Sequence, residues 1–79
     1  MSIEKKDLKY IYVIAGKNLK RIRKEHNLTQ IQLADLIGYE ESTISNIEAR
    51  PHRSFSLEFL YIISIKLNVP MEEFFKPID

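Results

Sequence analysis

Apolar and polar residues alternate at helical spacing between Thr29 and Glu48, and this pattern predicts two short helices separated by a turn. The first helix is indicated by Ile31, Leu33, Ala34 and Ile37, with Leu36 beside them. Thr29 is suited to cap its start, because a threonine hydroxyl accepts a hydrogen bond from the free backbone N–H groups of the first turn. Gly38 marks its end, since glycine enters the left-handed conformation without a steric penalty.

The second of these helices is predicted to begin near Glu41 and to bury Ile44 and Ile47. The side chains left on its other faces are Glu41, Ser42, Ser45 and Asn46. Two short helices joined through a glycine turn are what a helix-turn-helix requires. The spacing alone fits an ordinary helical hairpin of a small bundle equally well.

A longer helix is predicted upstream, from Asp7 to about Glu25. Its core-facing stripe consists of Tyr12, Ala15, Leu19 and Ile22. Further apolar surface on its other sides comes from Tyr10, Ile11, Val13 and Ile14. We therefore expect the front of this helix to contact something beyond its own core. Asn27 is expected to end the helix, because asparagine tolerates the left-handed conformation of a helix C-terminus.

The segment 57–67 is apolar almost all round, and Ser56 is expected to cap it as a helix. Its core face is predicted to carry Leu57, Leu60, Ser64 and Leu67. The residues off that face are Phe59, Ile62 and Ile65, joined by Phe74 or Phe75 of a short following helix. A small monomer rarely exposes such a stripe, so we interpret it as a dimer interface. The alternative is that the front of the helix over 7–25 covers it within one chain.

Together these elements predict a compact, all-α domain of five helices. The third helix should end before Pro51, because proline disfavours helix in the residue that precedes it. Asn68 is expected to end the fourth helix, and Pro70 opens the fifth. Residues 1–6 are polar and are expected to form a flexible N-terminal arm, which leaves 7–79 as a single domain with its dimerisation surface on the last two helices.

The composition favours a small binding protein over an enzyme. At 79 residues the chain forms one domain with a thin core, which association of two copies commonly stabilises. There are no cysteines, which excludes disulfides and thiolate metal sites. The two histidines, His26 and His52, have no nucleophile or metal-ligand spacing beside them, so we expect no catalytic residue, no metal and no cofactor. The charged start and the absence of an apolar run of transmembrane length predict a cytoplasmic protein.

The net charge of +1 conceals an asymmetry along the chain. The part before His26 carries a charge of +5, and the remainder carries −4. Such an asymmetry can indicate a polyanionic partner for the basic part. The alternative is that the lysines and arginines form a solvated helix face.

Several blocks of residues carry a resemblance to a known family. They are Ala15-Gly16-x-x-Leu19-x-x-Ile22-Arg23, Leu28-Thr29-Gln30-x-x-Leu33-Ala34, Gly38, Ser42-Thr43-Ile44-Ser45-x-Ile47-Glu48, and Ser56-Leu57-x-x-Leu60. In this order and spacing they resemble the small helix-turn-helix proteins of the lambdoid phage repressor type, often called the Xre family. The short length and the segment 56–60 look like controller proteins of restriction–modification systems. The loop 49–55 departs from the family, because the usual glycine after the glutamate is missing and the loop looks one residue longer.

The resemblance implies a DNA-binding surface centred on the helix that begins near Glu41. The base-reading positions it implies are Glu40, Glu41, Ser42 and Asn46. Gln30 resembles the family's phosphate-binding glutamine, and the further phosphate candidates are Thr43, Arg50, Arg53 and Lys17. Asparagine is suited to adenine and serine to either base type, whereas a glutamate can accept from cytosine. The alternative for the two glutamates is that they serve the helix dipole and point away from the duplex.

Arg23 and Glu48 correspond, by the same resemblance, to the arginine and glutamate that pair beneath the helix-turn-helix of the phage repressors. A bidentate pair of this kind would tie the first helix to the end of the third. The alternative is two independent surface charges. The implied role is structural, with no catalysis.

The resemblance therefore implies a transcriptional regulator that reads a pseudo-palindromic operator as a homodimer, with its recognition helices roughly 34 Å apart. Double-stranded DNA and a second copy are the expected partners, and no membrane or small-molecule ligand is expected. The alternative from another class is an antitoxin or protein-interaction module that uses the apolar surface of the helix over 57–67.

Overall fold

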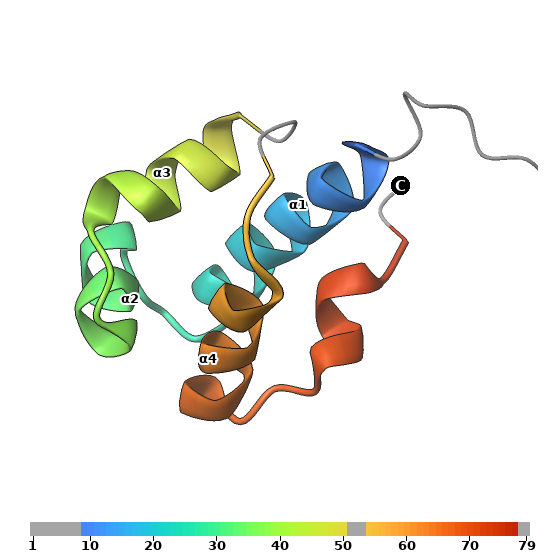
Figure 1. Ribbon diagram of the computed structural model, residues 1–79. Helices are drawn as coiled ribbons and strands as arrows, with labels where there is room; N and C mark the ends of the chain where they lie inside the picture. The colour runs from blue at the N-terminus through green and yellow to red at the C-terminus, as the bar shows by residue number, and fades with distance from the viewer. Residues whose placement is uncertain (1–8, 51–53, 78–79) are drawn as a thin grey trace, which may run out of the picture.

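The computed structural model describes residues 9–50 and 54–77, which form four α-helices and one short 3-10 helix (Figure 1). The α-helices are α1 (Tyr10–Glu25), α2 (Gln30–Ile37), α3 (Glu41–Ala49) and α4 (Leu57–Leu67), and the 3-10 helix is η2 (Met71–Phe75). Within the two described ranges no strand occurs, and no helix is long and apolar enough to cross a membrane. The all-α expectation is confirmed, with a 3-10 helix in the fifth position. The predicted arm over 1–6 and the predicted start at Asp7 lie outside the described residues.

The helix boundaries follow local signals in the sequence. The Thr29 hydroxyl accepts a hydrogen bond from the Gln32 N–H at 3.1 Å, and the Gln32 side chain accepts one from the Thr29 N–H at 2.9 Å. This reciprocal capping box satisfies two donors at the start of α2. Ser56 caps α4 by accepting a hydrogen bond from the Phe59 N–H at 3.1 Å. The residues that close α1, α2 and α4 in the left-handed conformation are Asn27, Gly38 and Asn68, with φ of 57°, 76° and 55°.

The core forms where α1 packs against α3 and η2, and where α2 packs against α3 and α4 (Figure 1). Its buried apolar residues are Ala15, Leu19, Ile22, Leu33, Ala34, Ile37, Ile44, Ile47, Phe59, Leu60, Ile63 and Phe74. This set contains the predicted core residues of α1, α2 and α3, apart from half-buried Tyr12 and exposed Ile31. The ring of Tyr12 packs edge-on against Phe55, with 5.2 Å between ring centroids.

The face that α4 turns to the core differs from the predicted one. Phe59 is fully buried because the rings of Tyr39 and Phe55 pack edge-on against it, at 5.1 and 5.9 Å. Leu57, predicted to face the core, is instead 67% exposed. Phe74 of η2 is fully buried as well. The assignment of Phe59 and Phe74 to an exposed dimer interface is therefore corrected: both belong to the core of the single chain.

A buried asparagine on α1 holds η2 in place. Asn18 is 1% exposed, and its side-chain amide donates to the carbonyl oxygens of Phe74 at 2.9 Å and Lys76 at 3.0 Å. Its own side-chain oxygen accepts from the Arg21 guanidinium at 3.2 Å. Arg21 also donates to the Glu73 carbonyl at 3.0 Å. These bonds satisfy backbone carbonyls that a short 3-10 helix leaves without partners.

Candidate nucleic-acid interface

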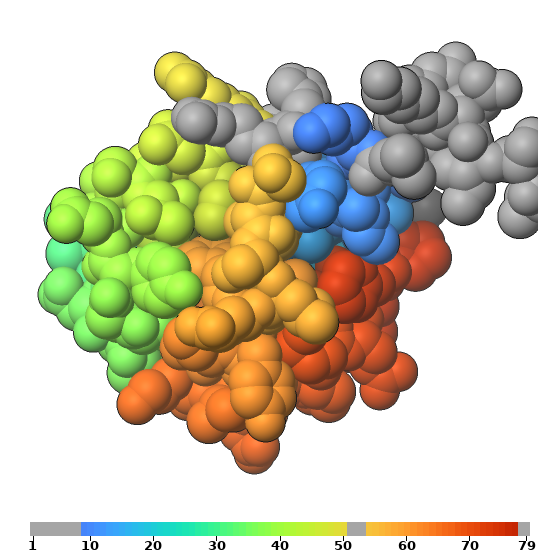
Figure 2. All heavy atoms as spheres, in the orientation of Figure 1, coloured from blue at the N-terminus to red at the C-terminus, as the bar shows by residue number. Residues whose placement is uncertain are grey.

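α3 lies along one side of the molecule with its outer face uncovered (Figures 1 and 2). Ile44 and Ile47 anchor its inner face in the core. At its start Glu41 and Ser42 are exposed, and one turn further on Asn46 is half buried. A short helix held on one side and open on the other has the shape that enters a major groove.

The approach of α3 to α1 depends on a glycine. A Cβ atom added at Gly16 would lie 2.9 Å from the Ile47 carbonyl oxygen. That distance is shorter than a carbon–oxygen contact allows, so any side chain at this position would push the two helices apart. Gly16 therefore fixes how deeply the C-terminal half of α3 sits on the scaffold.

Arg23 and Glu48 form a bidentate ion pair beneath the two helices. The Arg23 Nε and Nη2 atoms donate to the two Glu48 carboxylate oxygens at 2.8 and 2.9 Å. A third guanidinium nitrogen, Nη1, donates to the Leu28 carbonyl at 2.8 Å. The Arg23 and Glu48 side chains are only 9% and 4% exposed, and the hydrogen bonds to Glu48 raise the pKa of Arg23. The pair joins the end of α1 to the end of α3 and to the loop before α2.

The same carboxylate also contacts α2. The Gln30 side-chain amide donates to Glu48 Oε1 at 3.1 Å. A glutamine NH2 group carries two hydrogens, so this bond leaves one for another acceptor. Gln30 is the first residue of α2, where unpaired backbone N–H groups favour an anion. One charged pair thus connects all three helices that position the expected DNA contacts.

The other expected phosphate contacts are spread around α3. Arg50 is exposed directly after the helix, and Lys17 is exposed on α1. Thr43 is half buried and lines a shallow hollow with Asn46 and Phe55. Arg53 and His52 lie outside the described residues, as does the geometry of residues 51–53. All the described candidates except Lys17 lie on α2, α3 or the residue after α3.

The two acidic residues at the start of α3 are exposed. Glu40 is the N-cap residue, although its side chain makes no capping bond, and Glu41 occupies the first turn. The positive end of the helix dipole stabilises their negative charges. In the described part of the chain, no group of three or more Asp, Glu, His or Cys side chains is placed to bind a metal ion.

Two of the contacts that shape this surface have no signal in the sequence. The hydrogen bond from Gln30 to Glu48 joins residues 18 apart, and the close approach of Gly16 to Ile47 depends on the packing of two helices. Another side chain of α3 is bonded internally: the Ser45 hydroxyl donates to the Ser42 carbonyl at 3.2 Å. Ser45 is therefore less available to DNA than Ser42, whose own side chain is exposed.

Comparisons with known proteins agree with this geometry. The helix-turn-helix family model matches residues 19–74. A curated relative, the antitoxin PezA of Streptococcus pneumoniae serotype 4, is 41% identical over 54 residues. The match covers 68% of this chain and 34% of the relative, so the chain corresponds to about a third of that protein's length. This chain belongs to the Xre-like helix-turn-helix family, whose members are DNA-binding regulatory proteins.

Proposed function

We propose that this protein is a sequence-specific transcriptional regulator that binds a pseudo-palindromic operator as a homodimer, with α3 of each copy in the major groove. The observation that carries the proposal is a short helix whose inner face is anchored in the core, while Ser42 is exposed and Asn46 is partly exposed on it. The buried Arg23–Glu48 pair and the close contact at Gly16 hold that helix in position. A helix fixed in this way loses little conformational entropy when it binds.

In this proposal Asn46 reads a base through its side-chain amide, which suits the N6 and N7 atoms of adenine. Ser42 contacts either base type from the first turn of α3. Glu41 and Glu40 are the remaining base-reading residues. Their carboxylates would accept a hydrogen bond from the N4 amine of cytosine. The acidic start of α3 would then disfavour contact with guanine or thymine, which offer the carboxylates no hydrogen-bond donor in the major groove.

The residues proposed to contact DNA phosphates lie around these base-reading residues. Gln30 uses its remaining N–H at the start of α2, and Arg50 provides a positive charge at the end of α3. Thr43, Lys17 and Arg53 complete the set. Such contacts fix the register of the protein on DNA but do not read its sequence.

The test is the salt dependence of binding to an operator obtained by selection from random oligonucleotides. Each DNA phosphate neutralised by a lysine or arginine side chain contributes about −0.9 to the slope of log K against log salt concentration. Arg50→Ala should weaken binding to all sequences and flatten the slope by about 0.9 per protomer. The matched control is Lys66→Ala, which removes the same charge from an exposed position on α4. Equal slopes for both variants would remove Arg50 from the phosphate contacts. If the selection yields no preferred sequence, the proposed function is rejected.

A second candidate function is that of an antitoxin or another protein-interaction module. The 41% identity to an antitoxin favours it, as does the exposure of apolar side chains on α4. The two functions differ in what the purified chain does alone. A lack of salt-dependent DNA binding, together with a stoichiometric complex with a separate polypeptide encoded by a neighbouring gene, would favour this second function. The resemblance to restriction–modification controller proteins stays a prediction that the same neighbouring genes would test.

A further inference from the structure

Apolar side chains remain uncovered on one side of α4 and form a continuous stripe. Leu57, Tyr61 and Ile65 are 67%, 56% and 58% exposed, and residues four apart lie on the same side of a helix. This stripe lies on a different side of α4 from the buried Phe59 and Ile63. The exposed stripe is therefore rotated from the predicted one, and only Ile65 belongs to both.

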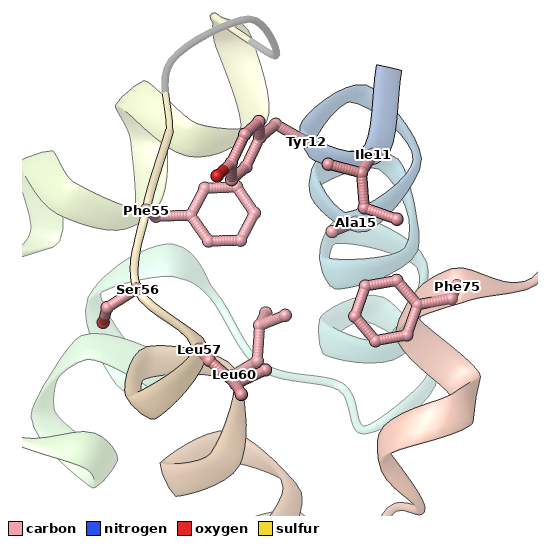
Figure 3. A pocket seen from close by; sticks show the side chains of 8 residues that line it. All are labelled: Ile11, Tyr12, Ala15, Phe55, Ser56, Leu57, Leu60 and Phe75. Carbon is pink, nitrogen blue, oxygen red and sulfur yellow. The ribbon is translucent and has the colours of Figure 1, made fainter. Parts of the chain in front are cut away.

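The stripe adjoins an apolar hollow between three elements (Figure 3). Ile11 and Tyr12 of α1, Phe55, Leu57 of α4 and Phe75 of η2 surround a space of about 190 Å³. Among the residues that the structure describes, no charged one lines it. An apolar cavity of about 150 Å³ can admit a benzene-sized group, so this hollow is large enough for one large apolar side chain. Figure 2 shows the same three elements meeting on one face of the molecule.

We propose that a second copy of this chain covers the stripe and the hollow, in a two-fold dimer in which the stripe of each copy packs against the hollow of the other. This inference deepens the proposed function, because it names the surface of the homodimer on which operator binding rests. It also replaces the interface residues expected from the sequence. Of those residues, Ile65 and Phe75 remain on the surface, whereas Ile62 is partly buried and packs against the core.

The size of the surface fits such a dimer. Side chains of this kind expose on the order of 200 Å² each when free, so the exposed fractions of Leu57, Tyr61, Ile65, Ile11 and Phe75 amount to roughly 500 Å². A standard interface buries about 800 Å² per partner, of which some 57–65% is apolar, or roughly 450–520 Å². The available apolar surface therefore matches one side of a standard interface.

The arrangement of the surface also fits a two-fold axis. Leu57 borders the hollow and also lines a second depression, whose other residues are Glu58, Tyr61 and Met71. A two-fold interface needs a surface that is complementary to itself, which a ridge and a hollow sharing one residue provide. An axis beside Leu57 would place each ridge opposite the partner's hollow. No residue of α2 or α3 belongs to this surface, so the α3 helix of each copy stays free to bind DNA.

The experiment is sedimentation equilibrium on the full chain and on two variants that carry the same substitution. Leu57→Glu places a charge in the proposed interface, whereas Leu36→Glu places it at another exposed leucine, on α2. Both positions are solvent-exposed in the single chain, so both variants should keep the helical circular dichroism of the parent protein. We expect a dimer for the parent protein and for Leu36→Glu, and at least a tenfold weaker self-association for Leu57→Glu.

Two results would overturn the inference. One is a parent protein that stays monomeric at all concentrations tested, which would leave the surface to a different partner. The other is a dimer that Leu57→Glu does not weaken, which would move the interface elsewhere on the chain. Binding of the Leu57→Glu monomer to a single operator half-site, measured in parallel, separates these results from a failure of the proposed function. That monomer should still bind the half-site with the salt dependence of the parent protein's half-site binding.

Discussion

Removal of the Glu48 carboxylate should destabilise the fold strongly. Glu48→Ala deletes two hydrogen bonds from Arg23 and one from Gln30, and it leaves the guanidinium with the Leu28 carbonyl alone. Arg23 is only 9% exposed, so water can replace the lost partner only in part. Stranding one member of a buried ion pair costs about 3–5 kcal/mol. Because a small single-core protein often has only about 3–5 kcal/mol of stability, the variant should retain little net stability at 25 °C.

Urea denaturation followed by circular dichroism measures this loss. The control is Glu72→Ala, which removes an exposed carboxylate from η2 and should change the unfolding free energy by less than about 0.5 kcal/mol. A double variant, Arg23→Met with Glu48→Leu, removes both charges together and should regain most of the stability, because an apolar pair of similar volume leaves no charge unpaired. If Glu48→Ala costs less than about 1 kcal/mol, the pair contributes no more than an exposed salt bridge and the reasoning is refuted.

Two further predictions concern the contacts that hold η2. Asn18→Ala should lower the unfolding free energy by about 2–4 kcal/mol, because it leaves two backbone carbonyl oxygens without donors; a loss below about 1 kcal/mol in urea denaturation would contradict this. The hydrogen bond from Lys76 and the nearby Arg21 charge lower the pKa of Glu73 from its ordinary value of 4.5. Glu73 therefore stabilises the fold fully above that value and progressively less as the pH falls through its lowered pKa. Glu73→Gln should flatten the pH dependence of stability below pH 4.5, and an unchanged dependence would exclude this contribution.

The helices and their ends could be predicted because their signals are local. Thr29, Gly38, Ser56 and Asn68 each act within a few residues of their own position, as caps or as left-handed ends. The inner faces of α1, α2 and α3 were also predictable, because their polar residues leave a distinct apolar stripe. The Arg23–Glu48 pair was accessible only through the family resemblance, since nothing local links residues 25 apart.

The parts that could not be predicted depend on packing between distant segments. α4 is apolar on nearly every side, so its sequence does not indicate which side faces the core. That choice follows from Tyr39 and Phe55, whose rings cover Phe59. Asn18 looks like a residue of the solvated face of α1 until η2, 56 residues later, places two carbonyls against it.

The central proposal is that α3 reads DNA, and the base preference of Asn46→Ala tests it most directly. The variant and the parent protein would be titrated against the selected operator and against every single-base change in one half-site, at one fixed salt concentration. Loss of a bidentate contact should remove about 1–3 kcal/mol of discrimination at one base pair and leave the other positions unchanged. An unaltered ranking of all the operator variants would show that Asn46 does not read a base, and that α3 does not lie in the groove as proposed.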